Sequence, residues 1–401
     1  MSRPGSSVHG KGVKLNGDPG GDISVFTKAL TAAESPETRL LSAFQKDTHP
    51  RKAYLAGREY YNEEGKTFEL RLVRRIKQQL SADPTTRPEY PSSLGLTEFT
   101  RRATEVALGK SSRATMENRA FGVQTPGFTA AVRLGAELLR HWYDVGAARC
   151  GTVYLSSPCH DSLAGIFQAA GIPDIREYYY WDDKKRGVCL EKLLEDLEKA
   201  PERSVVVLSA SAHYPTAADL SQNQWAMITK LVMRRRLFPF LLLPAQALCW
   251  GDLERDAWPV QYCASQGMEL LCEAVGHLLC VLKQNSLLLS VQRQADKIVR
   301  SLWAQPSVAG AQVVATVLSN PAHLVEWKDE LKSIVERCML IREVLRDRLR
   351  LLGTPGEQVE FLSKRRHVYL LPTGCLNVSA INGPNLDYIA ESIHLAVTTS
   401  V

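Results

Sequence analysis

The sequence lacks the cysteine patterns that mark metal sites and disulfide frameworks. It has nine cysteines in 401 residues, and none forms a C-x-x-C pair or a spacing typical of metal ligands. Several of them, including Cys249, Cys272 and Cys280, lie within apolar runs, where a small buried thiol is the ordinary interpretation. The pattern therefore predicts no metal site and favours a reducing compartment.

The sequence also has no run of apolar residues long enough to cross a membrane. The longest, residues 237–250, contains Pro239 and Pro244 and is shorter than a bilayer-spanning helix. The first residues show neither an apolar signal core nor an arginine-rich amphipathic pattern. We therefore expect a cytoplasmic protein that does not associate with membranes.

Positive charge is present but not concentrated. The formal net charge is +6, and the densest basic runs, residues 234–236 and 364–366, are three residues long. Basic residues commonly lie near the ends of helices, where they interact with the helix dipole. We favour that interpretation over nucleic-acid binding, and we expect no nucleic-acid partner.

The periodicity of apolar residues predicts an α/β protein. Residues 1–23 are rich in glycine, serine and lysine and are expected to form a flexible tail. Residues 66–80 and 129–143 have helical spacing. Short β-branched or apolar runs at 152–155, 204–208 and 238–243 are each separated by a helical stretch, a pattern typical of a buried parallel sheet.

The pattern changes after residue 310. A long amphipathic helix covers residues 331–349, two short strands are expected at 367–371 and 376–380, and a closing helix at 384–397. We therefore predict a large α/β domain with a mainly parallel sheet over residues 66–310. A smaller α+β domain is predicted over residues 311–401, joined by an N-terminal arm and small-domain part over residues 24–65.

Six strings carry a family resemblance: residues 153–158 (VYLSSP), 180–182 (YWD), 205–208 (VVVL) with 212–213 (AH), 253–258 (LERDAW), 297–300 (KIVR) and 385–389 (NLDYI). Together they resemble the cytosolic aspartate aminotransferases, which are pyridoxal-phosphate-dependent transferases of fold type I. The resemblance implies that fold, transamination between L-aspartate and 2-oxoglutarate, pyridoxal 5'-phosphate as cofactor, and a homodimer. Fold alone does not establish chemistry, so the site residues decide the activity.

Several residues that this chemistry needs are replaced. In the family a lysine forms a Schiff base with the cofactor and then transfers a proton. The resemblance aligns that lysine with Leu278, and the nearest lysine is Lys283. The carboxylate that keeps the pyridine nitrogen protonated aligns with Leu242. The arginines for the cofactor phosphate and the substrate α-carboxylate align with Ser286 and Cys375, neither of which can make their bidentate contacts.

Other family positions keep usable side chains. Thr129 retains a hydroxyl of the phosphate loop, and His160 replaces the aromatic residue that stacks on the cofactor ring. Tyr90 and Arg300 match residues that reach into the neighbouring subunit's site in the family, where Arg300 would bind the substrate side-chain carboxylate. Ordinary packing is the alternative interpretation for Tyr90 and Thr129, and a surface arginine is the alternative for Arg300.

The losses favour a catalytically degenerate homologue, in which binding of pyridoxal phosphate is itself in question. Two alternatives stay open at this stage. One is a weak pyridoxal-phosphate-dependent aminotransferase, or related chemistry on acidic amino acids, that uses Lys283 as a relocated amine. The other is a non-catalytic subunit that forms a heterodimer with an active aspartate aminotransferase and completes its partner's site.

Overall fold

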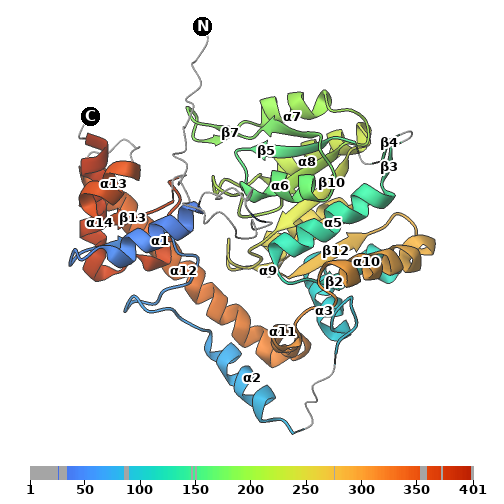
Figure 1. Ribbon diagram of the computed structural model, residues 1–401, viewed down its shortest axis with the longest axis horizontal. Helices are drawn as coiled ribbons and strands as arrows, with labels where there is room; N and C mark the ends of the chain where they lie inside the picture. The colour runs from blue at the N-terminus through green and yellow to red at the C-terminus, as the bar shows by residue number, and fades with distance from the viewer. Residues whose placement is uncertain are drawn as a thin grey trace, which may run out of the picture.

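The protein consists of a larger unit built on one sheet and a smaller unit arranged around the end of a long helix (Figure 1). The computed structural model describes residues 26, 34–84, 90–145, 148–149, 151–274, 276–352, 359–371 and 374–398. The segment 1–23, expected to be a flexible tail, lies outside the described residues.

The larger unit contains a seven-stranded sheet with the strand order β2-β12-β11-β10-β9-β5-β6. In that order the strands are Ala120–Gln124, His277–Val281, Leu270–Ala274, Phe238–Leu243, Val205–Ser209, Val153–Ser157 and Ile175–Tyr179. Within this sheet only β12 runs antiparallel to its neighbours. The strands predicted at 152–155, 204–208 and 238–243 are confirmed as β5, β9 and β10. Parallel strands end at one common edge of the sheet, where ligands of such folds bind.

Helices cover both faces of the sheet, as a buried parallel sheet requires. One face packs against α3 (Thr97–Leu108), α7 (Leu190–Glu198), α8 (Gln222–Arg234) and α9 (Leu253–Ser265). The other packs against α5 (Phe128–Trp142), α6 (Ser162–Ala169) and α10 (Leu288–Leu302). Every residue of β10 is buried, because the strand is covered on both sides. This burial explains why residues 238–243 form one continuous apolar run.

Strands β11 and β12 form a tight antiparallel hairpin. β12 begins at His277, three positions after β11 ends at Ala274. Gly276 has a positive φ of 71°, and its carbonyl accepts a hydrogen bond of 2.8 Å from the Thr125 amide. The chain therefore returns into the sheet within residues 275–276.

The smaller unit combines N-terminal and C-terminal segments. Its two-stranded parallel sheet pairs β1 (Ala53–Tyr54) with β13 (Val368–Tyr369). Its helices are α1 (Pro36–Lys46), α12 (Pro321–Leu352), α13 (Val359–Arg366) and α14 (Gly383–Thr398). The closing helix predicted at 384–397 is confirmed as α14. The division of the chain at residue 310 stays a prediction.

The strand predicted at 376–380 is wrong. Residues Val378–Ala380 form a short 3-10 turn, because the Asn377 side chain accepts the Ser379 amide at 3.0 Å. A side chain that bonds to nearby backbone in this way offers an alternative to strand pairing.

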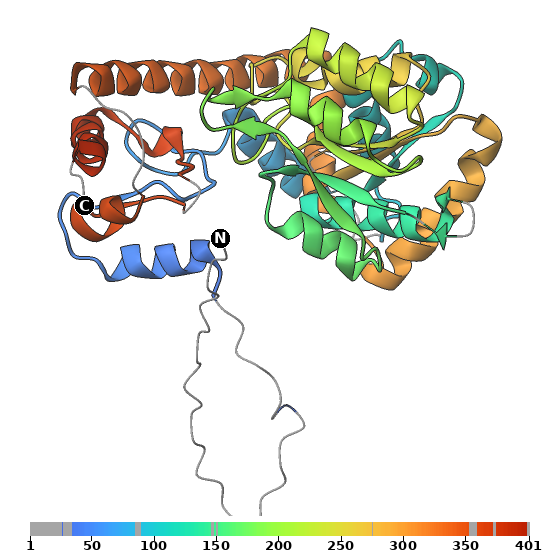
Figure 2. The ribbon, with the colours of Figure 1, turned by 90° about the horizontal axis from the view of Figure 1, so that it is seen from above.

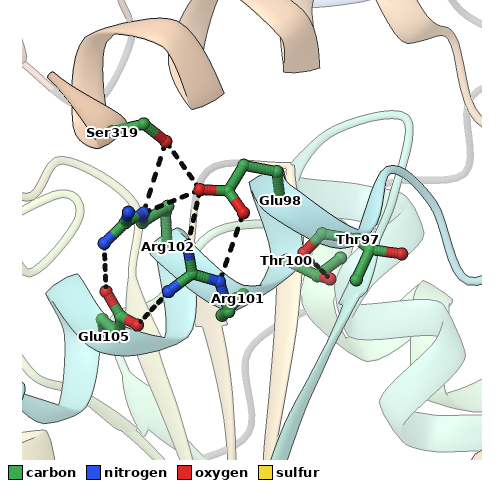
Figure 3. Close-up of polar contacts among 7 residues, drawn as sticks. All are labelled: Thr97, Glu98, Thr100, Arg101, Arg102, Glu105 and Ser319. Atoms are coloured by element: carbon green, nitrogen blue, oxygen red, sulfur yellow. Dashed lines mark hydrogen bonds and ion pairs between the residues drawn. The ribbon is translucent and has the colours of Figure 1, made fainter.

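The long helix α12 connects the two units, and Figure 2 shows it extending from the sheet-containing unit to the smaller one. At its start α11 (Val308–Ser319) packs on α3 and on α2 (Arg71–Ala82). The helix predicted over residues 66–80 begins at Arg71 in the structure, as α2. The Ser319 hydroxyl donates to Glu98 of α3 at 2.7 Å and accepts from Arg102 at 3.3 Å (Figure 3). These contacts fix the end of α11 to the larger unit.

Short elements complete the described chain: α4 (Arg113–Met116), β3 (Asp144–Val145), β4 (Ala148–Arg149), β7 (Trp181–Asp182), β8 (Gly187–Val188) and a 3-10 turn at Asn285–Leu287. Over the described residues, no single helix combines the length and apolar character needed to cross a membrane. Helices α11 and α12 satisfy both criteria only when joined, and they are bent by 104° relative to each other.

Candidate ligand-binding site

A cavity of about 590 Å³ lies at the carboxyl-terminal edge of the parallel strands. Val207 and Ser209 from β9 and Leu242 from β10 line it on the sheet side. The smaller unit contributes residues 55–58 and 375–377. Cavities of this size commonly hold small molecules or cofactors, so we identify this one as the candidate site.

Three aromatic side chains, those of Phe128, His160 and Tyr214, lie next to one another along one side of the cavity. The ring centroids of Phe128 and His160 are 5.9 Å apart, and those of His160 and Tyr214 are 5.2 Å apart. His160 Nδ1 lies 2.8 Å from the Ser162 hydroxyl, which holds the imidazole in place. These separations fall in the range for favourable ring contacts, so the three rings form a continuous surface.

The cavity carries little charge. Among its described lining residues, Arg58 is the sole lysine or arginine, and no aspartate or glutamate is present. The Arg58 side chain is 69% exposed and lies 3.3 Å from a carboxylate oxygen of Glu37. Such an exposed pair contributes little stability, so the Arg58 guanidinium is available to exchange partners.

Two thiols, those of Cys159 and Cys375, line the cavity. Burial raises the pKa of Cys159 to about 11, so the thiol stays protonated at neutral pH. Cys375 donates from Sγ to the Pro215 carbonyl at 3.1 Å, a contact between the smaller unit and the larger one. Neither cysteine replaces the charge of an arginine.

A buried histidine supports the sheet side of the site. His213 Nε2 lies 3.0 Å from the Ser156 hydroxyl, and its Nδ1 lies 2.8 Å from the Thr216 hydroxyl. Its ring stacks on Tyr180 with a centroid separation of 3.8 Å. Burial lowers the pKa of His213 to about 4, so the imidazole is neutral at physiological pH.

Leu278 does not line the cavity. It is fully buried in β12, where it pairs with Glu273 on one side and Val123 on the other. Two strand spacings separate it from Leu242, a distance of about 10 Å. Leu278 therefore does not face the cavity, and its alignment with the family lysine stays a prediction. The short hairpin is the reason, because it directs this residue into the sheet.

Lys283 does not line the cavity either, and its role as a relocated amine stays an untested alternative. Its side chain is exposed and follows the end of β12. Because β12 is antiparallel to β11, its last residue, Val281, lies opposite Leu270, where β11 begins. Lys283 therefore lies at the sheet edge opposite the cavity. Ser286, in the next turn, does not line the cavity either.

Of the four retained side chains, Thr129 and His160 line the cavity, whereas Tyr90 and Arg300 do not. Tyr90 is 87% exposed. Arg300 is exposed on α10 and forms a 2.6 Å ion pair with Asp296. Asp296 also accepts a hydrogen bond from Ser93. Tyr90 and Arg300 are thus surface residues of this chain, and their role in a partner's site stays a prediction.

The sequence interpretation did not single out Glu273. Its side chain is fully buried, and neither carboxylate oxygen has a hydrogen-bond partner. Burial raises the pKa of Glu273 to about 8, so the group is largely protonated at neutral pH. The available signal was a glutamate within an apolar strand. Such a residue is unusual, because glutamate is rarely buried unless its carboxyl group is paired.

The residues of the cavity do not fit covalently held pyridoxal phosphate. No described lining residue is a lysine, so no amine is positioned to form a Schiff base. Leu242 occupies the floor where a carboxylate would stabilise a protonated pyridine ring, and an unpaired cation against leucine is unfavourable. The described lining residues therefore include neither an amine for a Schiff base nor a carboxylate beneath the ring.

The sequence and fold match known proteins over most of the chain. Residues 55–382 match the family model "Aminotransferase class I and II". The chain is 39% identical to the cytoplasmic aspartate aminotransferase of Gallus gallus, an alignment that covers 94% of this chain and 98% of the relative. The fold expected from the sequence is confirmed by solved structures that share it.

Two of these structures cover 94% of this chain. An aromatic-amino-acid aminotransferase from Burkholderia pseudomallei, covalently bound to pyridoxal phosphate, has a TM-score of 0.88 at 27% identity and is covered over its full length. The cytoplasmic aspartate aminotransferase of Saccharomyces cerevisiae has a TM-score of 0.87 at 25% identity and is covered over 99% of its length.

Proposed function

Because the chain belongs to the class I and II aminotransferase family, we propose that it is an aspartate aminotransferase homologue without pyridoxal-phosphate catalysis. The observation that carries this proposal is the absence of an amine among the described residues that line the cavity. The protein would act in the cytoplasm as a homodimer whose cavity binds a ligand without a covalent bond.

The magnitudes support loss of activity rather than a small change in rate. A positioned proton-transfer group contributes roughly 10²–10⁴ in rate, and here the Schiff-base group is missing as well. Each lost charge-assisted hydrogen bond costs about 1.5–3 kcal/mol. Cys375 lines the cavity where the resemblance places one family arginine, and Ser286, aligned with the other, lies away from the cavity. These defects affect binding and chemistry separately, so one neighbouring residue cannot compensate for all of them.

Reductive trapping tests the proposal directly. The full chain is incubated with pyridoxal phosphate, reduced with borohydride, and digested for mass spectrometry. We expect only scattered, substoichiometric modification of surface lysines, and no aspartate–2-oxoglutarate transamination above that of a Lys283→Ala variant. A stoichiometric adduct at one lysine, or transamination that this variant loses, contradicts the proposal.

A second candidate is a non-catalytic subunit of a mixed dimer. The exposure of Tyr90 and Arg300 favours it, because neither side chain serves the cavity of its own chain. We expect the chain to co-purify with a co-expressed, differently tagged aspartate aminotransferase. In that mixed dimer, Arg300→Gln should lower activity towards aspartate without reducing assembly. Arg74→Gln, at another exposed arginine, is the matched control. Failure to co-purify removes this candidate.

A further inference from the structure

The inner part of the cavity is mainly apolar, with Ser156 and Ser209 as its hydroxyl groups on the sheet side. Its sheet side presents Leu242 and Val207, and Leu163 of α6 also lines it. All three side chains belong to the core packed between the sheet, α5 and α6. A charged ligand group placed against them would lose hydration without gaining a partner, so this region suits a hydrocarbon group.

The surface formed by Phe128, His160 and Tyr214 favours a planar group. Flat rings gain both buried area and favourable quadrupole interactions when they contact aromatic side chains. The Nδ1 atom of His160 is already engaged by the Ser162 hydroxyl at 2.8 Å. The apolar floor and the aromatic surface together therefore fit an aromatic ring.

Two polar side chains of the lining, Asn377 and Cys375, are already engaged. The Asn377 amide donates to the carbonyls of Gly57 and Glu59 at 3.0 and 2.6 Å, and its oxygen accepts the Ser379 amide. Cys375 donates to Pro215. Arg58 remains as the lining residue with a full charge, and its exposed pair with Glu37 is readily exchanged. One guanidinium fork matches one carboxylate.

We infer that the cavity binds an aromatic monocarboxylate, with its ring inside and its carboxylate on Arg58. The inference rests on the proposed function, since it requires that no Schiff base form. A dicarboxylate is disfavoured because its second charge meets leucine and valine rather than an arginine. The ligand class therefore differs from aspartate and 2-oxoglutarate.

Calorimetric titration of the full chain with three probes separates the contributions. 3-Phenylpropionate carries a ring and one carboxylate, 3-phenylpropanamide lacks the charge, and succinate lacks the ring. We expect 3-phenylpropionate to bind about tenfold more tightly than either comparator, since one charge-assisted contact is worth about that factor. Arg58→Gln should reduce its affinity to that of the amide, whereas Arg74→Gln, an arginine of similar exposure remote from the cavity, should not.

Three results overturn the inference: no binding of 3-phenylpropionate, succinate binding as tightly as 3-phenylpropionate, or equal affinities before and after Arg58→Gln. Its failure is distinct from failure of the proposed function. If borohydride trapping finds no specific adduct but 3-phenylpropionate does not bind, only the ligand class is wrong. A stoichiometric lysine adduct overturns the proposed function itself, whatever the titrations show.

Discussion

Leu242 and Glu273 lie side by side on adjacent parallel strands, yet only Leu242 lines the cavity. The carboxyl group of Glu273 is enclosed between the sheet and α5 without a hydrogen-bond partner. The cavity therefore has no carboxylate among its described lining residues, although a buried glutamate lies on the next strand. That buried acid has a measurable effect on stability.

Glu273→Gln should stabilise the protein increasingly as pH rises. In the unfolded chain the carboxyl has an ordinary pKa of 4.5, whereas burial raises its folded value to about 8. The folded protein therefore binds this proton more tightly, and wild-type stability falls as pH rises between these values. The loss is about 1 kcal/mol per pH unit, which the glutamine variant avoids. Urea unfolding at about pH 5, 6.5 and 8 measures the difference; an equal difference at all three contradicts the assignment.

Leu242 and Leu278, which the resemblance aligns with cofactor-contacting residues, should respond differently when each is replaced by lysine. Leu242→Lys places an amine in the cavity, so reduction in the presence of pyridoxal should yield an adduct at residue 242. Leu278→Lys buries an ammonium group in the sheet and should lower stability by about 3 kcal/mol or more without such an adduct. Mass spectrometry and thermal unfolding report both effects. An adduct at residue 278 and none at residue 242 would contradict this prediction, because residue 278 would then have to face the cavity.

Gly122→Ala should destabilise the sheet because of one buried ring. A β-carbon at Gly122 would overlap the imidazole of His277, which is fully buried on the next strand. Overpacking of this kind costs about 1–3 kcal/mol. The test compares the double variant Gly122→Ala/His277→Ala with each single variant by urea unfolding. The double variant should lose less stability than the sum of the two; simple additivity would refute the clash.

Glu98→Gln should weaken the attachment of α11 to α3. Hydrogen bonds from Arg101, Ser319 and Arg102 hold the pKa of Glu98 at about 2, below its ordinary 4.5. This contribution is therefore present above about pH 4.5 and disappears as pH falls towards 2. Because the group is largely exposed, the loss should be below about 1 kcal/mol at neutral pH. It should shrink further in about 1 M salt, where surface charges are screened. A salt-independent loss would indicate packing rather than charge.

The sequence predicted the layers of the fold better than the position of individual site residues. Residues 238–243 are apolar throughout because β10 is covered on both faces, and such a run is recognisable without a structure. The strand predicted at 376–380 failed because a single side chain, Asn377, engages the backbone there. Local side-chain bonding of this kind competes with periodicity and is difficult to weigh from residue types alone.

Leu278 shows a different limit. The strings on either side of it identify the family, but they do not specify how many residues join β11 to β12. With only residues 275–276 between the strands, the residues that follow pair within the sheet instead of lining the cavity. Glu273 was missed because an acid in an apolar strand signals burial but does not show whether its carboxyl group is paired.

The hairpin between β11 and β12 also bears on whether this chain could regain its family's chemistry by evolution. At position 278, a single-codon change to lysine would introduce a buried charge, not a catalytic group. Recovery there would require an insertion that lengthens the connection after Ala274 and leaves the seven-stranded sheet intact. Intermediates along that route would gain no catalytic advantage until the new loop reached the cavity. If the chain lacks pyridoxal-phosphate catalysis, as we propose, that loss is close to irreversible at this connection, and selection can act instead on what the cavity binds.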